Sequence, residues 1–356
     1  MKKQLQLLFL LIFIFSITMA ATVNLETAQR VASHIYVERS NTGSPDFIVQ
    51  SIDMIDENSV NLFYIFHLEP TGFIIVPADD RVTPILAYSF ENNFIMENMP
   101  GNVAYLMNLY QSVILGAIES GQEPDEDILA SWGKYVSGEN LDVDLRVAVA
   151  LNTVEWHECY PYNVFYPEDV NGCDGYALAG APAVAMAQIM HYHAFPLEGE
   201  GENEVILTDF EDQYVNFEEA TYDYYPTDSY NDDVTITAAD SAAAYLIWHA
   251  GVAAHQSFEI GGTWNIREIE DIKDAFHNHF YYNDNIDLIW RYYDFSSDQG
   301  FIDILKFELD SSRPILYWAD DGGNSNTHVW VIDGYLEDSF EMNWGWGGDW
   351  NGLYTL

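Results

Sequence analysis

The sequence predicts an α+β fold in which helices come before an antiparallel sheet, and two observations carry this prediction. Apolar residues recur at helical spacing in three segments between residues 238 and 309. From residue 314 to the end, short apolar runs with strand character follow one another, separated by polar and glycine-rich turns. Helices grouped before strands are typical of α+β proteins rather than of a parallel sheet. The chain has 356 residues, of which 49% are hydrophobic, so two domains with substantial cores are expected.

The N-terminal part is predicted to form a small α+β unit over residues 22–127. Its expected elements are a helix over 25–37, strands over 59–68 and 72–77 joined by a turn, and an amphipathic helix over 103–118. Residues 128–148 are expected to connect this unit to the second domain, with helical spacing around 129–136. The second domain is then expected over 149–356.

Apolar periodicity also places the elements of the second domain. One helix is expected to begin at about residue 182, and three more are expected over 238–254, 266–280 and 301–309. The expected strands cover 314–318, 329–333, 339–344 and 353 onward. Residues 199–236 are acidic, rich in tyrosine and without periodicity, so long surface loops are expected there.

The first 21 residues have the pattern of a cleavable secretory signal. Lys2 and Lys3 precede a mostly apolar run over 7–19, and the small residues Ala20 and Ala21 follow it. The run is shorter than the roughly 20 apolar residues that a membrane-spanning helix needs. We therefore expect an exported protein, secreted or held in the cell envelope, with an N-terminal anchor as the alternative reading of the same residues.

The net charge of the chain argues against two classes of partner. Acidic residues number 57 and basic residues 12, which gives a formal net charge of −45. Such a surface repels nucleic acid and anionic lipid, so neither nucleic acid nor a membrane, once the signal is removed, is expected as a partner.

The chain has two cysteines, Cys159 and Cys173. In an exported protein they can pair and close a short loop, but spacing alone does not show whether their Cα atoms lie within bridging distance. His191 and His193 lie two residues apart near a helix end, and no cluster of cysteine and histidine has metal-ligand spacing. No metal or other cofactor is expected.

The segment around Ala181 has the features of a reactive helix start. Pro182 is suited to the first position of a helix, where a missing N–H costs nothing, so residue 181 is expected at the positive end of the helix dipole. A cysteine placed there would have its pKa lowered. The alternative is an ordinary buried helix that starts with proline.

A second motif lies far downstream. His328 stands at the start of an apolar strand, after a loop rich in glycine, asparagine and serine, where a general base is well placed. The next strand ends in Asn343-Trp344-Gly345-Trp346-Gly347-Gly348, and a histidine base needs a partner to fix its tautomer and ring plane. The alternative is an aromatic β-turn without a catalytic role.

Together these motifs resemble the streptopain family of papain-like cysteine peptidases, which are made with an inhibitory propeptide. Residues 24–120 resemble that propeptide, most clearly over 72–81 and 85–89, and residues 151–163 resemble the start of the mature enzyme. The resemblance implies a papain-like fold, with a helical part and an antiparallel sheet, preceded by a small α+β propeptide domain.

The resemblance also implies the site residues. Counting from the run 187–190, the nucleophilic cysteine of the family falls at position 181, where this chain has alanine. It makes His328 the general base and Asn343 the residue that orients it. Supporting and cleft roles fall to Gln188, Trp344 and Trp346.

The expected function is therefore that of a peptidase homologue without its nucleophile, a pseudopeptidase that binds a protein or peptide ligand and its own propeptide in cis. One alternative is an active endopeptidase that uses Cys173 or whose residue 181 is mis-recorded. Another is an adhesion or inhibitor protein that works through the N-terminal domain. Other departures from the family are Pro182, the segment 261–264 and a C-terminal end that is shorter than usual, so a truncated chain is also expected.

Overall fold

A computed structural model describes residues 22–40, 46–142, 149–226, 235–259, 263–266, 269–320 and 327–356. The predicted signal peptide, the loop over 321–326, and residues 261 and 262 of the segment 261–264 that departs from the family lie outside the described residues. Within the part of the chain that is described, no helix combines the length and the apolar character needed to cross a membrane.

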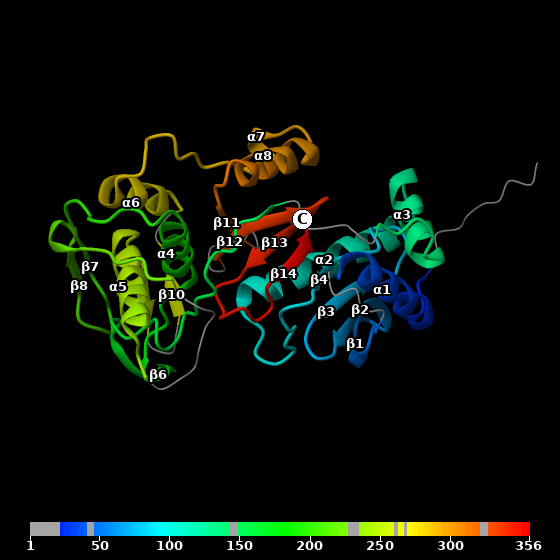
Figure 1. Ribbon diagram of the computed structural model, residues 1–356, viewed down its shortest axis with the longest axis horizontal. Coiled ribbons are helices and arrows are strands. Elements are labelled where there is room, and N and C mark those ends of the chain that lie inside the picture. Colours follow the sequence, from blue (N-terminus) through cyan, green and yellow to red (C-terminus); the bar gives the residue numbers. More distant parts are fainter. Residues whose placement is uncertain are drawn as a thin grey trace, which may run out of the picture.

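The structure has the predicted α+β architecture, with helices on both sides of one long antiparallel sheet (Figure 1). The described helices are α1 (Leu25–Arg39), α2 (Gly101–Ser120), α3 (Glu126–Ser137), α4 (Ala181–His193), α5 (Ala238–Ala253), α6 (Glu270–Phe280), α7 (Arg291–Asp294) and α8 (Asp298–Asp310), with a 3₁₀ turn over Phe217–Glu219. The first strands are β1 (Val49–Glu57), β2 (Val60–Leu68), β3 (Phe73–Pro77), β4 (Ala87–Ser89), β5 (Val149–Ala150), β6 (Glu168–Cys173) and β7 (Glu202–Val205). The remaining strands are β8 (Gln213–Asn216), β9 (Ser257–Glu259), β10 (Thr263–Asn265), β11 (Ile315–Asp320), β12 (Thr327–Leu336), β13 (Ser339–Asn343) and β14 (Gly352–Thr355).

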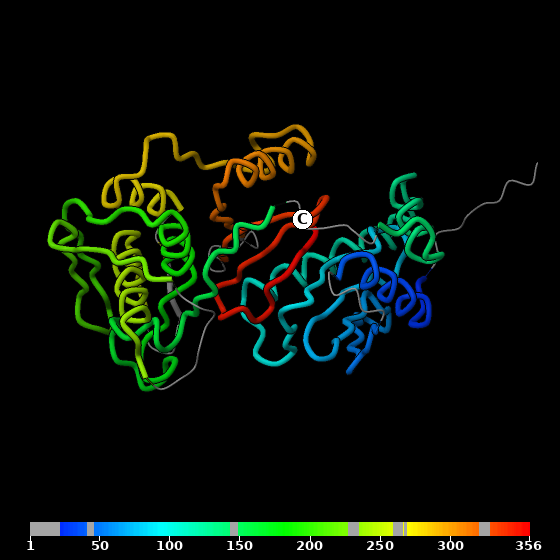
Figure 2. The backbone as a smooth tube through the Cα atoms, in the orientation of Figure 1, coloured from blue at the N-terminus to red at the C-terminus, as the bar shows by residue number. Residues whose placement is uncertain are grey.

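The main sheet joins the two ends of the chain. Its strand order is β1-β2-β3-β4-β14-β13-β12-β11, with β5 paired to β12. The junction is the antiparallel pair β4–β14, in which Tyr88 lies opposite Leu353 and Ala87 opposite Tyr354. The carboxyl-terminal strands consequently lie between the N-terminal elements and the helical part (Figure 2). A sheet that spans both regions holds the N-terminal part against the rest of the chain by backbone hydrogen bonds.

Helices α1 and α2 cover opposite faces of the N-terminal strands. Because side chains alternate along a strand, Phe63 and Ile65 of β2 pack with α2, whereas Tyr64 and Phe66 pack with α1. Both faces of β2 are therefore buried, as its apolar sequence predicts. Helix α2 extends further and packs on the C-terminal strands as well, in a core that includes Trp330.

A buried charged cluster ties α1 to α3. The Glu38 carboxylate receives hydrogen bonds from the Tyr135 hydroxyl and the Asp142 backbone N–H, and it lies 2.5 Å from Lys134 Nζ. Burial alone would raise the pKa of Glu38, but the hydrogen bonds of Lys134, Tyr135 and Asp142 lower it. Arg39, also buried, bonds to Tyr135 and crosses to the C-terminal part of the chain.

The third core fills the helical part. Helix α4 lies between α5 and the sheet, and α5 lies between α4 and α6. The region 199–236, expected to consist of loops, contains the short antiparallel hairpin β7–β8, whose Val205 and Val215 are buried against α5. The prediction of loops is wrong there, because a few apolar side chains among many charges suffice for a two-stranded hairpin that packs on a helix.

Candidate active site

The start of α4 is built into the centre of the molecule. The helix begins at Ala181, one residue before the predicted start, and Pro182 lies in its first turn. Gly180 precedes it with φ +80°, a conformation that favours glycine. On one face Ala181, Ala185 and Ile189 pack against β12, and the other face enters the helical core. The small alanine side chains allow this close packing on two sides.

Three buried polar side chains hold the turn that leads into α4. Gln256 Nε2 donates to Ala179 O at 2.7 Å, and Asn163 Nδ2 donates to Ala177 O at 3.2 Å. The Gly180 backbone N–H hydrogen-bonds to Glu158. These contacts fix the backbone on which residue 181 is carried, and sequence reasoning did not find any of the three side chains.

Glu158 is the one titratable residue of these three, and its pKa is strongly shifted. Burial raises its pKa to about 8, and the hydrogen bond from Gly180 opposes this shift in part. Its Oε2 atom has no hydrogen-bond partner among the described residues. The sequence signal for it is weak: an acid within the segment Trp156–Tyr162, which is rich in aromatic residues. At neutral pH a protonated carboxyl group therefore lies behind the start of α4.

The raised pKa of Glu158 leads to a pH-dependent stability. The pKa of a glutamate in an unfolded chain is about 4.3. A carboxyl group whose pKa is higher in the folded protein contributes stability that is fully present below the unfolded-state pKa. This stability is lost as the pH rises toward 8. We expect Glu158→Gln to gain stability over the wild type, by on the order of 2 kcal/mol, between pH 5 and pH 8.

Urea denaturation of both proteins across this pH range measures the difference. Glu204→Gln, which changes an exposed acid on β7, is the matched control and should follow the wild type at every pH. A gain for Glu158→Gln that stays constant with pH would show that the carboxyl group does not titrate in this range.

His328 lies on the face of β12 that the N-terminal part covers. A methyl group placed on Gly101, the first residue of α2, would lie 2.9 Å from His328 Cε1. The Tyr105 ring, one turn further along α2, lies 5.3 Å from the imidazole centroid. Ala181 instead packs against Val329 and Val331, whose side chains alternate with that of His328. The structure thus places Ala181 and His328 on adjacent elements but on opposite faces of β12.

Asn343 is buried in a network that joins three segments. Its Nδ2 atom donates to Thr153 Oγ1 at 2.9 Å and to Val154 O at 3.0 Å, and its Oδ1 atom accepts from Gln188 Nε2 at 3.2 Å. Gln188 is fully buried and also donates to Val154 O. The hydrogen bonds of Asn343 described for this structure therefore tie β13 to α4 and to residues 153–154.

The two tryptophans of the glycine-rich loop have different surroundings. Trp344 is fully buried, donates through Nε1 to Trp350 O at 3.0 Å, and lies 4.9 Å from the Trp330 ring. Trp346 is half-buried, with its ring 5.0 Å from His157 in an edge-on arrangement. Trp344 belongs to the core beneath α2, whereas Trp346 lies against the segment that leads to Glu158.

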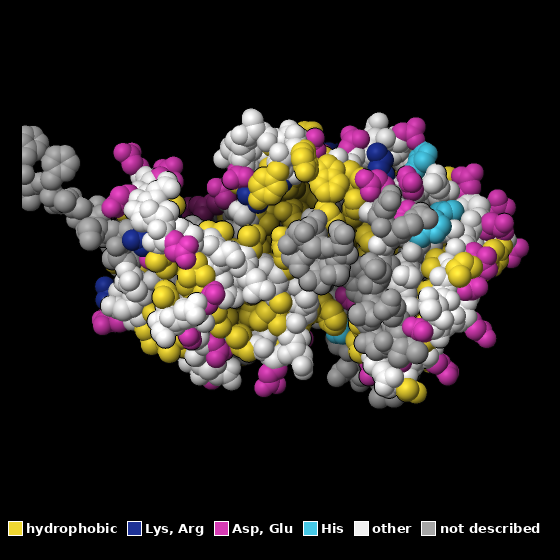
Figure 3. Space-filling view, turned by 180° about the vertical axis from the view of Figure 1, so that it is seen from behind, with side chains coloured by type: hydrophobic (Ala, Val, Ile, Leu, Met, Phe, Trp, Pro, Cys, Tyr) yellow, Lys and Arg dark blue, Asp and Glu magenta, His cyan; other side chains and the backbone are white. Residues whose placement is uncertain are grey.

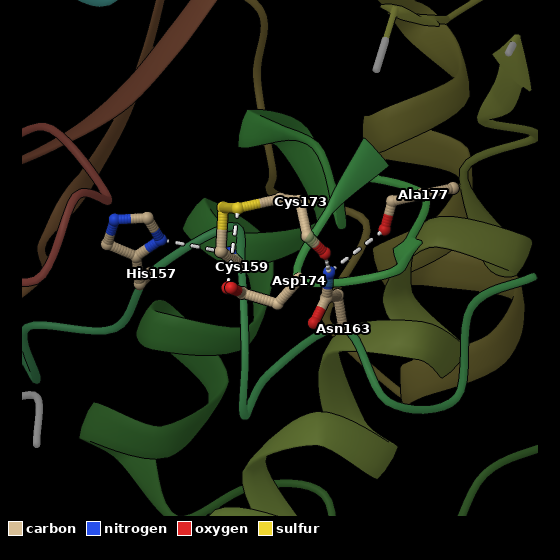
Figure 4. The surroundings of a disulfide bond; sticks show 6 residues. All are labelled: His157, Cys159, Asn163, Cys173, Asp174 and Ala177. Atoms are coloured by element: carbon tan, nitrogen blue, oxygen red, sulfur yellow. Dashed lines mark hydrogen bonds between the residues drawn. A yellow bond between two sulfur atoms is a disulfide. The ribbon is translucent and has the colours of Figure 1, made fainter. Parts of the chain in front are cut away.

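Cys159 and Cys173 form a disulfide bond, with their Cα atoms 5.5 Å apart (Figure 4). Asn163 donates from Nδ2 to Cys173 O as well as to Ala177 O, so the bridged loop is tied to the turn before α4. These are the two cysteines of the sequence. The hypothesis that Cys173 serves as a relocated nucleophile is wrong for this structure, because its sulfur is bonded to that of Cys159 and provides no thiolate.

The fold and these residues correspond to a known class of protein. Residues 156–354 match the model of the peptidase C10 family, and residues 20–114 match the model of the Spi protease inhibitor. The chain belongs to the peptidase C10 family. The inhibitor match includes Gly101 and Tyr105, so the part of the chain that covers His328 is the inhibitor-like part.

Sequence relatives match most or all of this chain at low identity. The thiol protease/hemagglutinin PrtT of Porphyromonas gingivalis is 27% identical over the whole of this chain, which spans 41% of the length of PrtT. Streptopain of Streptococcus pyogenes is 26% identical over 87% of this chain and 78% of its own.

Two solved structures of Prevotella intermedia proteins are similar. A fragment of prointerpain A in which one cysteine is replaced by alanine has a TM-score of 0.68 and 25% identity, over 86% of this chain and 92% of its own. Active wild-type interpain A has a TM-score of 0.52 and 27% identity, over 59% of this chain and 86% of its own. The papain-like fold with an N-terminal propeptide domain is thereby confirmed.

Proposed function

We propose that this chain is an exported C10 peptidase homologue that lacks peptidase activity, keeps its inhibitor-like N-terminal part, and binds polypeptide segments. The observation that carries the proposal is the side chain at the start of α4. In cysteine peptidases an activated thiolate attacks the peptide carbonyl, and position 181 here has a methyl group. Neither of the two cysteines of the chain is free to replace it.

The remaining parts of the proposed machinery follow from the resemblance to the family. His328 takes the role of general base and Asn343 that of the residue that supports it, with Gln188, Trp344 and Trp346 behind them. The ring of His328 must leave its place beside Gly101 to approach the start of α4. The proposal therefore describes a site that is closed by α2 and cannot be opened by the chain itself.

Retention of the N-terminal part tests this proposal. Without a nucleophile the chain cannot remove its own propeptide, so prolonged incubation of the purified protein should leave one species near full length on a denaturing gel. Release of the N-terminal part at a rate independent of protein concentration, with contaminating proteases inhibited, would contradict the proposal.

An added protease that cleaves after acidic residues is expected to cut between α2 and α3, after Asp125, where residues 121–125 are mostly exposed. The two fragments should remain together under native conditions, since α3 packs on α1 through Glu38, Lys134 and Tyr135 and the sheet pair β4–β14 is intact. Gel filtration of the nicked protein measures this.

A further inference from the structure

A row of aromatic rings leads from the α4–β12 contact out to solvent. Trp318 of β11 packs against the cluster that contains Ala181 and Val329. The Trp290 ring lies edge-on to Trp318, with the centroids 5.1 Å apart, and Tyr293 lies 6.5 Å beyond Trp290. Trp290, Tyr292, Tyr293 and Trp318 are called the aromatic face below.

The outer part of this face is unusually exposed. Tyr292 and Tyr293 are 83% and 88% exposed, and the short helix α7 that carries them has no buried residue. Seen from behind, hydrophobic side chains gather where α7 and β11 lie (Figure 3). Exposed aromatic side chains grouped in this way mark binding surfaces more often than they serve the fold. Tyr292 contacts the Arg291 guanidinium and Tyr293 contacts the Trp290 ring, and both tyrosines keep most of their surface exposed.

The inner end of the aromatic face lies on the α4 side of the sheet. Trp318 is opposite Val329 in the β11–β12 pair and packs with the cluster that contains Ala181. Tyr105 of α2 lies against His328 on the other side. The inhibitor-like part therefore covers His328 and leaves Tyr292 and Tyr293 exposed.

The inner end of the face offers a hydrogen-bond donor. Trp318 Nε1 is buried and has no hydrogen-bond partner among the described residues. An indole N–H can only donate, so its natural partner is a carbonyl oxygen, such as that of a peptide backbone. The face thus combines exposed stacking surfaces with one unpartnered donor, which is buried at its inner end in this structure.

Charge decides which polypeptide fits. The chain carries a net charge of −45, and Arg291, the cation of α7, is paired with Asp298 at 3.0 Å. A positively charged segment is attracted to such a protein, whereas an acidic segment is repelled. We infer that the aromatic face binds an extended, positively charged polypeptide segment through its aromatic or aliphatic side chains. This rests on the proposed function, because the ligand belongs to the class proposed there.

Fluorescence anisotropy with the full-length protein tests the inference. The probe is a fluorescein-labelled peptide of alternating lysine and phenylalanine, compared with a lysine–serine peptide and a glutamate–phenylalanine peptide. We expect the lysine–phenylalanine peptide to bind most tightly, with an affinity that falls as salt is added. The double change Tyr292→Ala with Tyr293→Ala should weaken its binding about tenfold, as for aromatic residues at the centre of an interface.

Tyr214→Ala is the matched control, since Tyr214 is half exposed on β8, far along the chain from the face, and this variant should bind as the wild type does. Unchanged affinity in the double variant, or equal binding of the acidic peptide, would overturn the inference. So would self-association in sedimentation experiments that the double variant abolishes, because the face would then serve a second copy of the chain.

The two proposals can fail separately. In the full-length protein α2 covers His328, so the peptide signal reports on the aromatic face and not on the covered site. Binding that is lost in the double variant, together with self-release of the N-terminal part, would overturn the missing-nucleophile proposal and leave the aromatic face standing. Retention of the N-terminal part without peptide binding would overturn the aromatic-face inference and leave the missing-nucleophile proposal standing.

Discussion

The purified protein is expected to show no measurable hydrolysis of casein under reducing conditions, at a rate about 10⁶-fold below that of a peptidase with its nucleophile in place. The physical reason is the methyl side chain of Ala181 at the positive end of α4. In the proposed site the backbone N–H groups at the start of α4 would hold an oxyanion, but residue 181 has no atom that can attack a carbonyl. Iodoacetamide, which alkylates the two cysteines once the disulfide is reduced, should leave the result unchanged, since neither cysteine stands at position 181.

Two variants serve as controls for this expectation. Ala181→Cys alone should restore little activity, because Pro182 fixes φ near −65° and removes a backbone N–H in the first turn. Adding Pro182→Val should restore more, after the N-terminal part has been removed. Equal rates for the single and double variants would show that the proline is harmless, and hydrolysis by the wild type that disappears in Cys173→Ser would refute the expectation itself.

Replacing Arg39 by alanine is expected to lower the free energy of unfolding by about 3 kcal/mol. The guanidinium is buried and donates to the hydroxyls of Tyr88 and Tyr135 at 3.1 Å each, and to Glu337 Oε2 at 2.5 Å. Glu337 is 55% exposed and can turn to water, so most of the loss comes from the buried partners, which are the two tyrosines and the Glu38 carboxylate 3.7 Å from Nε, and from the buried stem.

Arg30→Ala provides the comparison on the same helix. Arg30 is exposed and pairs with Glu26 at 3.4 Å, an interaction of about 0.5 kcal/mol or less. Urea denaturation measures both variants. Because Arg39 links α1 to the β12–β13 turn, amide hydrogen exchange in α1 and α3 should also rise in Arg39→Ala alone. Equal losses of unfolding free energy in the two variants would mean that the buried contacts of Arg39 stabilise the protein no more than an exposed ion pair does.

Secondary structure with strong periodicity was predictable from sequence. The helix expected over 25–37 is α1, and the strands expected over 329–333 and 339–344 are β12 and β13, with shifted ends. Strand β1 was missed because Val49–Glu57 alternates apolar residues with acids and is mostly exposed at the edge of the sheet. Helix α7 was missed because a helix of four residues has no periodicity to detect.

The candidate site was only partly readable from sequence. The motif around Gln188 gave the register, so position 181 followed from counting along one helix, and α4 begins there. Glu158, Asn163 and Gln256, which hold the turn before α4, gave no comparable signal. Their function depends on hydrogen bonds to backbone atoms that burial brings close, and a buried polar residue looks like a surface residue in a sequence.

Sequence by itself determined the composition of this protein: an acidic α+β chain with alanine at the start of a buried helix, a histidine at a strand start and two cysteines. These properties depend on residue type and on local spacing. Tertiary structure alone decided that the cysteines pair, that the His328 ring lies against Gly101, and that Arg39 reaches Glu337. Each of these contacts joins residues whose separation is set by how the strands and helices pack, and local spacing does not encode that packing.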